Sequence, residues 1–566
     1  MKRFSQKLVL LAACICAAAG NITAQEVPQR VHVKFRVLFK DKIGTPYRID
    51  KPEAFLSEKA IMRRMKQQIP IVENDLPVNP EYVAAIASMG IKVLNRSKWM
   101  NAVTIELADS QIITKVEALS FVHSTKKIAR TKPKEKKDDL MEAFVRLFEE
   151  GQTVQKPKKA TGSYYGSGAK QVQMLNGNAL HQQGFNGRGI TIAVLDAGFS
   201  KVNENRFFDS LRVSGRLLGT RDFVEGGESV FEDNSHGASV LSVMAANIPD
   251  EFVGSAAYAN YWLLRTEDAD SEYLIEEDNW VTGAEFADSV GADIINSSLG
   301  YTRYDDPGTS YTQQQLNGKT AWITRAGDIA ASKGILVVNS AGNSGADSWK
   351  YMGVPADGDS VMAIGAVGSA REYAPFSSQG PTADGRIKPN VTAMGMGIPA
   401  ISPSGNIAPY NGTSFSSPLM AGMAACLWQA CPQASAMQVF KAIEQSASQY
   451  DSPDALKGFG IPDFSKAQQL LTANLADKSK GDSIVHLYYN PFIKGLVLEY
   501  YSNATQKVAL EVKNTNGKRV LRKSFEVFAH QNSIIRLPKL RKLKSGQYEV
   551  EVVAGEKKVS RRITVK

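Results

Sequence analysis

The chain has 566 residues, too many for one hydrophobic core, so two to four domains are expected. Its four cysteines and six histidines form no cluster with zinc-ligand spacing, which argues against a zinc-built protein. The formal net charge of +10 includes +9 over residues 26–160, −13 over residues 161–475 and +11 over residues 476–566. An acidic middle between basic ends indicates segments that complement one another, and it argues against nucleic acid as a partner.

Residues 1–24 have the pattern of an export signal. Basic residues precede the apolar run Leu8–Ala19, and a small residue stands directly before Gln25. The run is too short to span a membrane. Lipidation at Cys14 is an alternative that ranks second, because Cys14 lies early for such a site. We therefore predict an exported protein that is secreted or held at the cell surface.

Residues 25–130 are expected to form a small α/β unit that could fold alone. The expected strands are His32–Phe39, Ile91–Leu94 and Ala102–Leu107, and the expected helices are Phe55–Gln68, Pro80–Met89 and Asp109–Leu119. The next segment, residues 131–170, begins with a charged run and becomes rich in Lys, Gly and Ser. We interpret it as a solvated linker that is open to proteolysis.

Residues 171–475 alternate strands and helices at the spacing of βαβ units. The stretch Ile190–Leu195 is apolar throughout, as expected of a parallel strand covered on both faces. Further strands are expected at Tyr261–Arg265, Ile294–Ile295, Ile335–Asn339 and Val361–Val367, and helices at Ala238–Ala246, Ala284–Val290, Ala326–Lys333 and Ser414–Gln429. The pattern predicts a doubly wound, mostly parallel α/β domain with its site at the carboxyl ends of the strands.

Residues 476–566 change to all-β signals. Strands are expected at Val485–Tyr489, Leu496–Tyr501, Val508–Lys513, Ser533–Leu537 and Tyr548–Val553, with turns at Asn516–Gly517 and Ser545–Gly546. This spacing predicts a small β-sandwich.

Ser414 is the first candidate for chemistry. A turn-forming Asn-Gly pair precedes it, and the apolar run that follows predicts a buried helix. A serine at such a helix start lies beside unpaired backbone N–H groups and the positive end of the helix dipole. Both features help an alkoxide to form and help to hold an oxyanion. Serine is also a favoured helix N-cap, so the local pattern alone does not establish a nucleophile.

A serine nucleophile needs a general base, and the base needs a group that orients it. Of the two histidines in the acidic segment, His236 precedes a predicted helix, whereas His181 is expected to be an ordinary surface residue. Asp196 ends the apolar strand, where a carboxylate is costly unless it is paired or functional. The order Asp196, His236, Ser414 is one of the three known orders of the catalytic triad.

Asn343 is a candidate for oxyanion stabilisation. It lies in the small-residue loop Ser340–Gly345, after a predicted strand. Small residues let the backbone and the Asn343 amide approach a substrate closely, and an amide aimed at a developing oxyanion is a large electrostatic effect in acyl transfer. Taken alone, the loop is also an ordinary Gly/Asn turn.

Four short motifs contain these candidates, namely Val194–Gly198, Asn234–Gly237, Ser340–Asn343 and Gly412–Pro418. Together they resemble the subtilases, the subtilisin-like serine peptidases, over residues 175–470. The resemblance implies that Asp196 orients His236, that His236 deprotonates Ser414, and that Asn343 and the Ser414 N–H hold the oxyanion. It implies peptide hydrolysis without a required cofactor. It also implies that four residues pair with the substrate backbone, namely Ser297, Ser298, Leu299 and Gly300.

The sequence departs from the family pattern at several positions. Ala197 and Ala238 stand where a hydroxyl residue is usual, and Asn390 stands where Asp is common, which we expect to alter local stability. An insert at Tyr301–Lys319 lengthens the loop after the substrate strand, so the family's specificity is not carried over. Structural calcium is common in the family, but no loop in this sequence assigns a site for it.

The flanking segments fit the same resemblance. Residues 25–130 resemble a subtilase propeptide, an intramolecular chaperone and inhibitor, and their positive charge favours docking on the acidic domain. Residues 476–566, with Asn490–Phe492 and Ser545–Tyr548, resemble the C-terminal sorting domain of type IX secretion, whose machinery would then be a partner. We predict a secreted zymogen that is inhibited by its own propeptide, is matured in the linker, and acts on protein or peptide substrates.

Three alternatives remain at this stage. A catalytically silent scaffold that acts as a surface binding protein would lack a triad member, and none is missing. A protein that works through its β-tail would keep its function in Ser414→Ala, and an esterase would prefer esters to peptides. Cys426 and Cys431 are interpreted as two buried free thiols, with a local disulfide formed after export as the alternative.

Overall fold

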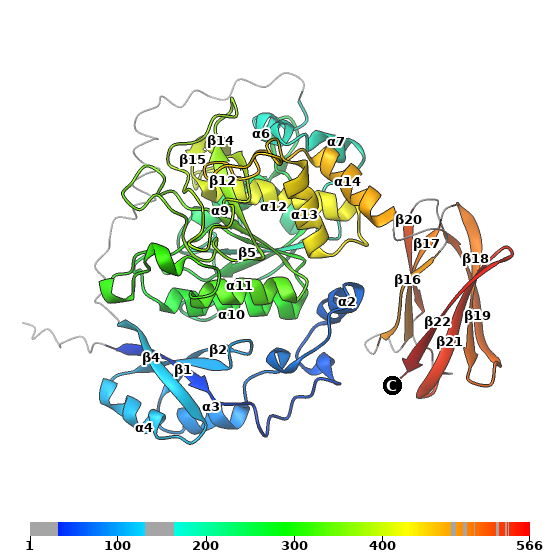
Figure 1. Cartoon of the computed structure of the whole chain (residues 1–566), viewed down its shortest axis with the longest axis horizontal. Coiled ribbons are helices and arrows are strands. Elements are labelled where there is room, and N and C mark those ends of the chain that lie inside the picture. Colours follow the sequence, from blue (N-terminus) through cyan, green and yellow to red (C-terminus); the bar gives the residue numbers. More distant parts are fainter. Residues whose placement is uncertain are drawn as a thin grey trace, which may run out of the picture.

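A computed structural model describes residues 32–130, 163–476, 483–490, 495–502, 504–527, 531–537, 540 and 543–565. They form an N-terminal domain (32–130), a central domain (163–476) and a C-terminal domain (483–565) (Figure 1). The predicted export signal, most of the predicted linker and most of the Asn490–Phe492 motif lie outside the described residues. Within the described part of the chain, no helix combines the length and the apolarity needed to cross a bilayer.

The central domain is built on a seven-stranded sheet in which every neighbouring pair of strands runs parallel. The strand order is β13-β12-β11-β10-β5-β9-β6. The strands are β5 Thr191–Asp196, β6 Leu217–Asp222, β9 Asn260–Arg265, β10 Ile294–Ser297, β11 Leu336–Ser340, β12 Val361–Val367 and β13 Val391–Met394. Parallel strands require crossover connections, usually helices, and this arrangement confirms the predicted doubly wound fold.

Helices cover both faces of the sheet with two separate cores. Ile192 and Val194 of β5 belong to the core with α9 and α12, while Ala193 and Leu195 belong to the core with α10 and α11. This alternation is the period-two rule of a strand that is buried on both faces. The main helices are α9 His236–Ala245, α10 Ile275–Val290, α11 Trp322–Ser332, α12 Thr413–Ala430, α13 Ala436–Ser446 and α14 Phe464–Ala476. The smaller elements include α6 Ala169–Met174, α7 Asn178–Gln182, α8 Asp209–Val213, β14 Met396–Ile401 and β15 Ile407–Asn411.

The predicted site residues lie where the strands of this sheet end. Asp196 is the last residue of β5, Ser297 is the last residue of β10, and Asn343 follows β11. His236 begins α9, and Ser414 is the second residue of α12. Because all the strands run in one direction, their carboxyl ends converge on one edge of the sheet, as expected of a doubly wound domain.

The N-terminal domain is a four-stranded antiparallel sheet with the strand order β2-β3-β1-β4. Its elements include β1 Val33–Phe39, α3 Pro80–Ala87, β2 Lys92–Ser97, β3 Ala102–Leu107, α4 Ile113–Glu117 and β4 Val122–Arg130. The helices α3 and α4 share a core with one face of the sheet. The other face meets α10, where Arg36 Nε donates to Asp278 Oδ1 at 2.8 Å and Asn95 Nδ2 donates to Asn279 Oδ1 at 2.6 Å (Figure 1).

Glu285 of α10 binds the end of β2 and the residues that follow it. Its carboxylate accepts hydrogen bonds from the Ser97 hydroxyl at 2.5 Å, the Lys98 N–H at 2.7 Å and the Trp99 N–H at 3.0 Å. Burial raises the pKa of Glu285 to about 7, although the charge of Lys98 and these hydrogen bonds oppose the rise. Covering this carboxylate with a second domain therefore costs free energy when the acid is ionised.

The C-terminal domain is a sandwich of two antiparallel sheets, as predicted. The sheets have the strand orders β16-β17-β20 and β19-β18-β21-β22, and both contribute to one core. The strands are β16 Ser483–Asn490, β17 Gly495–Ser502, β18 Gln506–Asn514, β19 Arg519–Val527, β20 Gln531–Leu537, β21 Gly546–Ala554 and β22 Lys557–Val565. Sequence patterns did not predict β19 and β22, because Lys and Arg occupy most of their outward-facing positions.

Several expected elements have different bounds in the structure. The predicted helix Ala284–Val290 is only the second half of α10, because its first half carries the acids Glu276, Glu277 and Asp278. Acidic residues are rarely buried, yet all three are buried in the structure. The helix expected over residues 55–68 is the shorter α2 (Glu58–Lys66). The cysteines of α12 and its C-terminal end are buried and free, in agreement with the two-thiol interpretation.

We expect a chain cut between the N-terminal and central domains to release the N-terminal domain faster as pH rises toward 7. When the domain leaves, Glu285 faces water and its pKa returns toward its ordinary value of 4.5. Between pH 4.5 and about pH 7, binding of the domain therefore takes up a proton on Glu285. This contribution to affinity is fully present below pH 4.5 and is lost as pH rises through about 7, a change of up to roughly three hundredfold.

Release rates measured by chromatography between about pH 5 and 8 test this linkage. Glu285→Gln cannot titrate, so its release rate should depend less on pH than that of the parent chain. An equal pH dependence in the two proteins would contradict the assignment to Glu285.

Candidate active site

His236 and Asp196 form a buried pair. His236 Nδ1 lies 2.7 Å from Asp196 Oδ1, and the two side chains are 8% and 0% exposed. Asp196 Oδ1 also accepts the Ala197 N–H at 2.8 Å, and the His236 N–H donates to Asn234 Oδ1 at 2.7 Å. An imidazole that donates from Nδ1 to a carboxylate keeps Nε2 as the basic nitrogen.

Two glycines allow this pair to form. A Cβ on Gly237 would lie 2.5 Å from the carbonyl oxygen of Gly198 and 2.9 Å from Asp196 Cβ. A Cβ on Gly198 would lie 2.5 Å from the carbonyl oxygen of Asn234. A larger side chain at either position would push the start of α9 away from the end of β5 and separate His236 from Asp196.

Ser414 lies close to this pair at the buried start of α12. The residue is 4% exposed, its Oγ lies 3.4 Å from the Ser298 carbonyl oxygen, and Ser298 Oγ donates to the Ser414 carbonyl at 2.9 Å. The ring centroid of Phe415 lies 6.2 Å from that of the His236 imidazole. The residue that follows the candidate nucleophile therefore lies beside the ring of the candidate base, while Ser414 Oγ itself is within hydrogen-bond distance of the Ser298 carbonyl.

Asn343 and the backbone of Ser414 border one small space. Asn343 Oδ1 accepts the Thr413 N–H at 2.9 Å and the Thr413 hydroxyl at 3.0 Å, which leaves the amide nitrogen Nδ2 to donate elsewhere. A Cβ on Gly412 would lie 3.6 Å from Asn343 Nδ2 and 3.7 Å from the Ser414 nitrogen. Two N–H donors thus border a common space in which an oxyanion could be held.

Thr413 is a residue of the candidate site that the sequence prediction missed. Its hydroxyl donates to Asn343 and also accepts the Gly342 N–H at 3.1 Å, so it ties the loop after β11 to the start of α12. The signal that could have found it is its place directly before Ser414, where a hydroxyl can reach neighbouring backbone groups.

The residues expected to bind the substrate backbone do not share one role. The Ser297 hydroxyl is buried and accepts an indole N–H from α10 at 3.0 Å, so its side chain points away from the site. The Leu299 carbonyl accepts from Asn339 Nδ2 at 3.0 Å. Gly300 is exposed, and its amide and carbonyl make no hydrogen bond within the described residues. Ser298 and Gly300 thus remain the candidates for backbone pairing with a substrate.

His181 is not the surface residue that the sequence predicted. Its Nδ1 lies 2.8 Å from the Tyr165 hydroxyl and its Nε2 lies 3.0 Å from the Ser255 carbonyl oxygen. Burial lowers the pKa of His181, which favours the neutral ring. These neighbours lie outside the candidate site.

The surroundings of Asn390 favour an amide over a carboxylate at this position. Its Nδ2 donates to Glu444 Oε1 at 2.8 Å, and its Oδ1 accepts the Ala363 N–H at 2.8 Å. Glu444 already places a carboxylate here, so a second one would repel it, whereas the amide satisfies both neighbours. The expected effect on stability stays a prediction.

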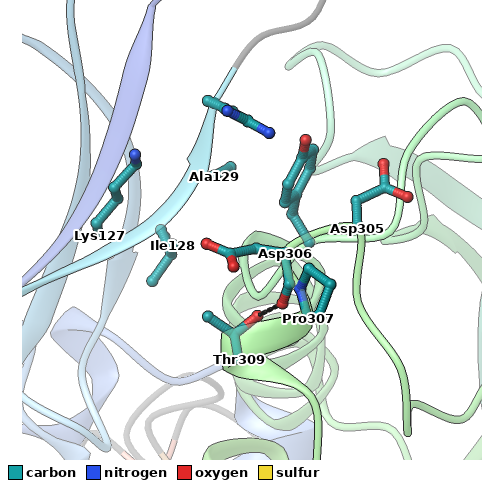
Figure 2. A pocket seen from close by; sticks show the side chains of 9 residues that line it. Lys127, Ile128, Ala129, Asp305, Asp306, Pro307 and Thr309 are labelled. Carbon is teal, nitrogen blue, oxygen red and sulfur yellow. Dashed lines mark hydrogen bonds between the residues drawn. The ribbon is translucent and has the colours of Figure 1, made fainter.

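The end of β4 meets the loop after Gly300 at a cavity of about 160 Å³. Figure 2 shows Lys127, Ile128 and Ala129 on the β4 side, with Asp305, Asp306, Pro307 and Thr309 on the opposite side. A hydrogen bond with Tyr273 and the charges of the two aspartates raise the pKa of Arg130. The last residues of the N-terminal domain therefore contact the loop that continues from the candidate substrate strand.

Three carboxylates have oxygen atoms within 4.8 Å of one another, those of Glu267, Glu272 and Glu276. Among the described residues, this is the one cluster of side chains that could hold a metal ion. Glu267 Oε2 accepts the Tyr301 hydroxyl at 2.5 Å, and Glu276 accepts the Asp268 N–H at 3.1 Å. Burial raises the pKa of Glu276 well above its ordinary range and that of Glu267 to about 7. The Tyr301 hydroxyl and the Asp268 N–H therefore already occupy part of the acceptor capacity of this cluster, and structural calcium stays an expectation that no residue here assigns.

Comparison with known proteins identifies similarities in all three domains. The profile described as "Subtilase family" matches residues 187–460, "Peptidase S8 propeptide domain, Bacteroidota" matches residues 34–141, and "Secretion system C-terminal sorting domain" matches residues 486–566. These ranges do not coincide with the predicted domain boundaries, which stay predictions.

Three relatives show how far the similarity extends. The chain is 32% identical over 281 residues to subtilisin from Bacillus pumilus, a match that covers 49% of this chain and 90% of that protein. It is 30% identical over 291 residues to subtilisin BL from Lederbergia lenta, covering 51% and 94%. It is also 32% identical over 281 residues to subtilisin E from Bacillus subtilis (strain 168), covering 49% of this chain but only 65% of that protein.

We expect Gly412→Ala to slow the reaction of Ser414 with a fluorophosphonate by roughly a hundredfold, the size of effect expected when an oxyanion donor is lost. The added methyl group would border the space between the two N–H donors, at a residue whose φ is +151°. Gly385→Ala is the matched control, because Gly385 has a φ of +83° but open space around its Cβ position. Equal slowing of the fluorophosphonate reaction in both variants would show that backbone strain, and not the methyl group in this space, causes the slowing.

Proposed function

The chain belongs to the subtilase family, and on that premise we propose that it is a secreted serine endopeptidase made as a self-inhibited zymogen. The observation that carries the proposal is the pairing of His236 with Asp196 at 2.7 Å beside the buried start of the helix that holds Ser414. The three residues come from separate segments and converge on the carboxyl edge of the sheet. Such a set fits acyl transfer to a serine hydroxyl.

In the proposed reaction, Ser414 Oγ attacks the carbonyl carbon of the scissile peptide bond while His236 Nε2 takes the hydroxyl proton. The Asp196 carboxylate holds the imidazole by Nδ1 and stabilises its positive charge. The Asn343 amide and the Ser414 N–H donate to the oxyanion of the tetrahedral intermediate. His236 then gives its proton to the leaving amine, and water repeats the sequence to release the acyl group. None of these steps requires a cofactor.

The contacts of the N-terminal domain support its role as inhibitor. It covers the acidic side of α10 and brings the end of β4 against the loop that continues from the candidate substrate strand. The match to a subtilase propeptide agrees with this role. We propose that the N-terminal domain blocks access of protein and peptide substrates until the linker is cut.

The C-terminal domain supports the proposed export. Its match to a secretion sorting domain suggests that the type IX secretion machinery recognises this part of the chain. The proposed destination is the cell surface or the medium, after removal of the export signal.

We expect wild-type protein expressed from residue 25 onward to be cut between Arg130 and Lys170, and Ser414→Ala protein to stay whole. The triad is complete, and the composition of the linker, charged and then rich in Lys, Gly and Ser, is typical of a segment that proteases cut. Intact mass of the two purified proteins measures the outcome, and the new N-terminus locates the maturation site.

Identical cutting of the two proteins would mean that a host protease matures the chain. If neither protein is cut and the central domain does not react with a fluorophosphonate, the peptidase assignment is wrong.

A further inference from the structure

The N-terminal domain contacts the central domain through two segments, which meet at Asp288. Its sheet lies along α10, and a second segment, here called the arm, connects β1 to α3 as residues 41–79. The arm contains η1 (Pro52–Ala54), α2 and η2 (Glu73–Asp75). In Figure 1, α2 stands apart from the four strands of the N-terminal sheet.

The helix α2 binds the edge of the central sheet where the strands begin. Lys59 Nζ donates to Thr191 Oγ1 at 2.5 Å and to Asp293 Oδ2 at 2.7 Å. Thr191 is the first residue of β5, and Asp293 directly precedes β10. The candidate catalytic residues lie at the other end of these strands, so α2 docks on the side of the domain opposite the active site.

Arg63 contacts the C-terminal ends of two helices. Its buried guanidinium donates to the carbonyls of Asp288 and Ala292 at the end of α10, and to the carbonyl of Lys333 at 3.2 Å, directly after α11. Unpaired carbonyls and the negative end of the helix dipole favour a cation at such a place. Lys333 in turn places its ammonium 3.0 Å from Asp75 of the arm, so each domain supplies a cation to an acceptor of the other.

Asp288 is fully buried and takes three cationic partners from the N-terminal domain. Arg63 donates to its carboxylate, Arg64 donates at 2.7 and 2.8 Å, and Lys98 Nζ lies 3.3 Å away. Burial raises the pKa of Asp288, but the charges of Lys98, Arg63 and Arg64 outweigh burial and hold it well below its ordinary value. The ionised carboxylate therefore depends on the N-terminal domain for its neutralisation.

The surface of the central domain is shaped to receive α2. Gly291 and Gly334 follow α10 and α11, and both have a φ of +85°. A Cβ on Gly291 would lie 2.6 Å from Lys59 Cβ, and one on Gly334 would lie 2.7 Å from Gln67 Nε2. Gln67 donates to the Gly334 carbonyl at 2.7 Å and accepts the Ala436 N–H at 3.0 Å, at the start of α13.

We propose that α2 is a second anchor beside the N-terminal sheet, which keeps the N-terminal domain on the central domain after the chain between Arg130 and Ser163 is cut. The docking site recognises a basic helix through Asp288, Asp293 and the carbonyl ends of α10 and α11. Inhibition then ends only when the arm leaves this site or is itself cut. The inference rests on the proposed function in one respect, since it takes the N-terminal domain to be the inhibitor.

The test uses the full chain carrying Ser414→Ala, so that cleavage does not depend on the chain's own activity. Limited trypsin treatment nicks the linker, and intact mass identifies the digestion time at which the chain is cut once between residues 131 and 162. Size-exclusion chromatography without denaturant then measures how fast the N-terminal fragment leaves. We expect the fragment to co-elute with the central domain.

Matched variants assign this retention to the anchor. Arg63→Gln/Arg64→Gln should release the fragment at least about a hundredfold faster, because buried carboxylate partners are lost. Arg48→Gln is the control, since Arg48 lies on the same arm, is 65% exposed and pairs with Asp50 of the arm at 2.9 Å. Gln67→Ala removes a neutral contact and should speed release about tenfold; it replaces the double variant if that protein does not fold.

Prompt loss of the fragment from the nicked parent chain, or equal release rates for the double variant and Arg48→Gln, would overturn the anchor. A different result would separate the two proposals. If the wild-type chain is inactive but nicked Ser414→Ala protein still retains the fragment through Arg63 and Arg64, the peptidase proposal is contradicted and the anchor is supported. Failure of one inference is thus distinguishable from failure of the other.

Discussion

The hydrogen bond between His236 and Asp196 is the interaction on which the candidate site depends, and the parallel sheet makes it possible. Asp196 ends β5 and His236 begins α9, and two glycines let the start of the helix approach the end of the strand. Ser414 and Asn343 reach the same edge from distant segments, because every strand of the sheet runs in one direction. A site assembled in this way accepts long insertions elsewhere, such as the loop after the substrate strand.

The helix α10 connects this site to the N-terminal domain. One side packs in the core of the sheet through Trp280 and Ala284, and the other presents Asp278, Glu285 and Asp288. Buried carboxylates cost roughly several kcal/mol each unless partners compensate them, and the N-terminal domain supplies those cations and N–H groups. The opposite charges of the two segments therefore correspond to one specific interface. The domain that compensates these acids also brings β4 to the substrate loop, which links folding to inhibition.

Local sequence predicted the parts of the site that lie at the ends of apolar elements. Asp196, His236 and Ser414 each stand at such an end beside small residues, so a parallel sheet is expected to bring them to one edge, and their roles stay predictions. The rest depends on tertiary contacts that no local pattern contains. Thr413 gains its contacts only when the loop after β11 lies beside it, and the half-buried His181 is held by Tyr165 and by the carbonyl of the distant Ser255. Helical spacing likewise predicted α2, but its target on the central domain requires the three-dimensional arrangement.

The most direct test of the proposed triad is fluorophosphonate labelling of the mature protein, with peptide mapping of the modified residue. We predict labelling at Ser414 and a rate that falls by roughly 10³–10⁴ in Asp196→Asn, because the His236 ring would lose its orienting carboxylate. Circular dichroism of the variant would show that its fold is unchanged. Labelling of another serine, or an unchanged rate in Asp196→Asn, would contradict the assignment of the three residues as one catalytic unit.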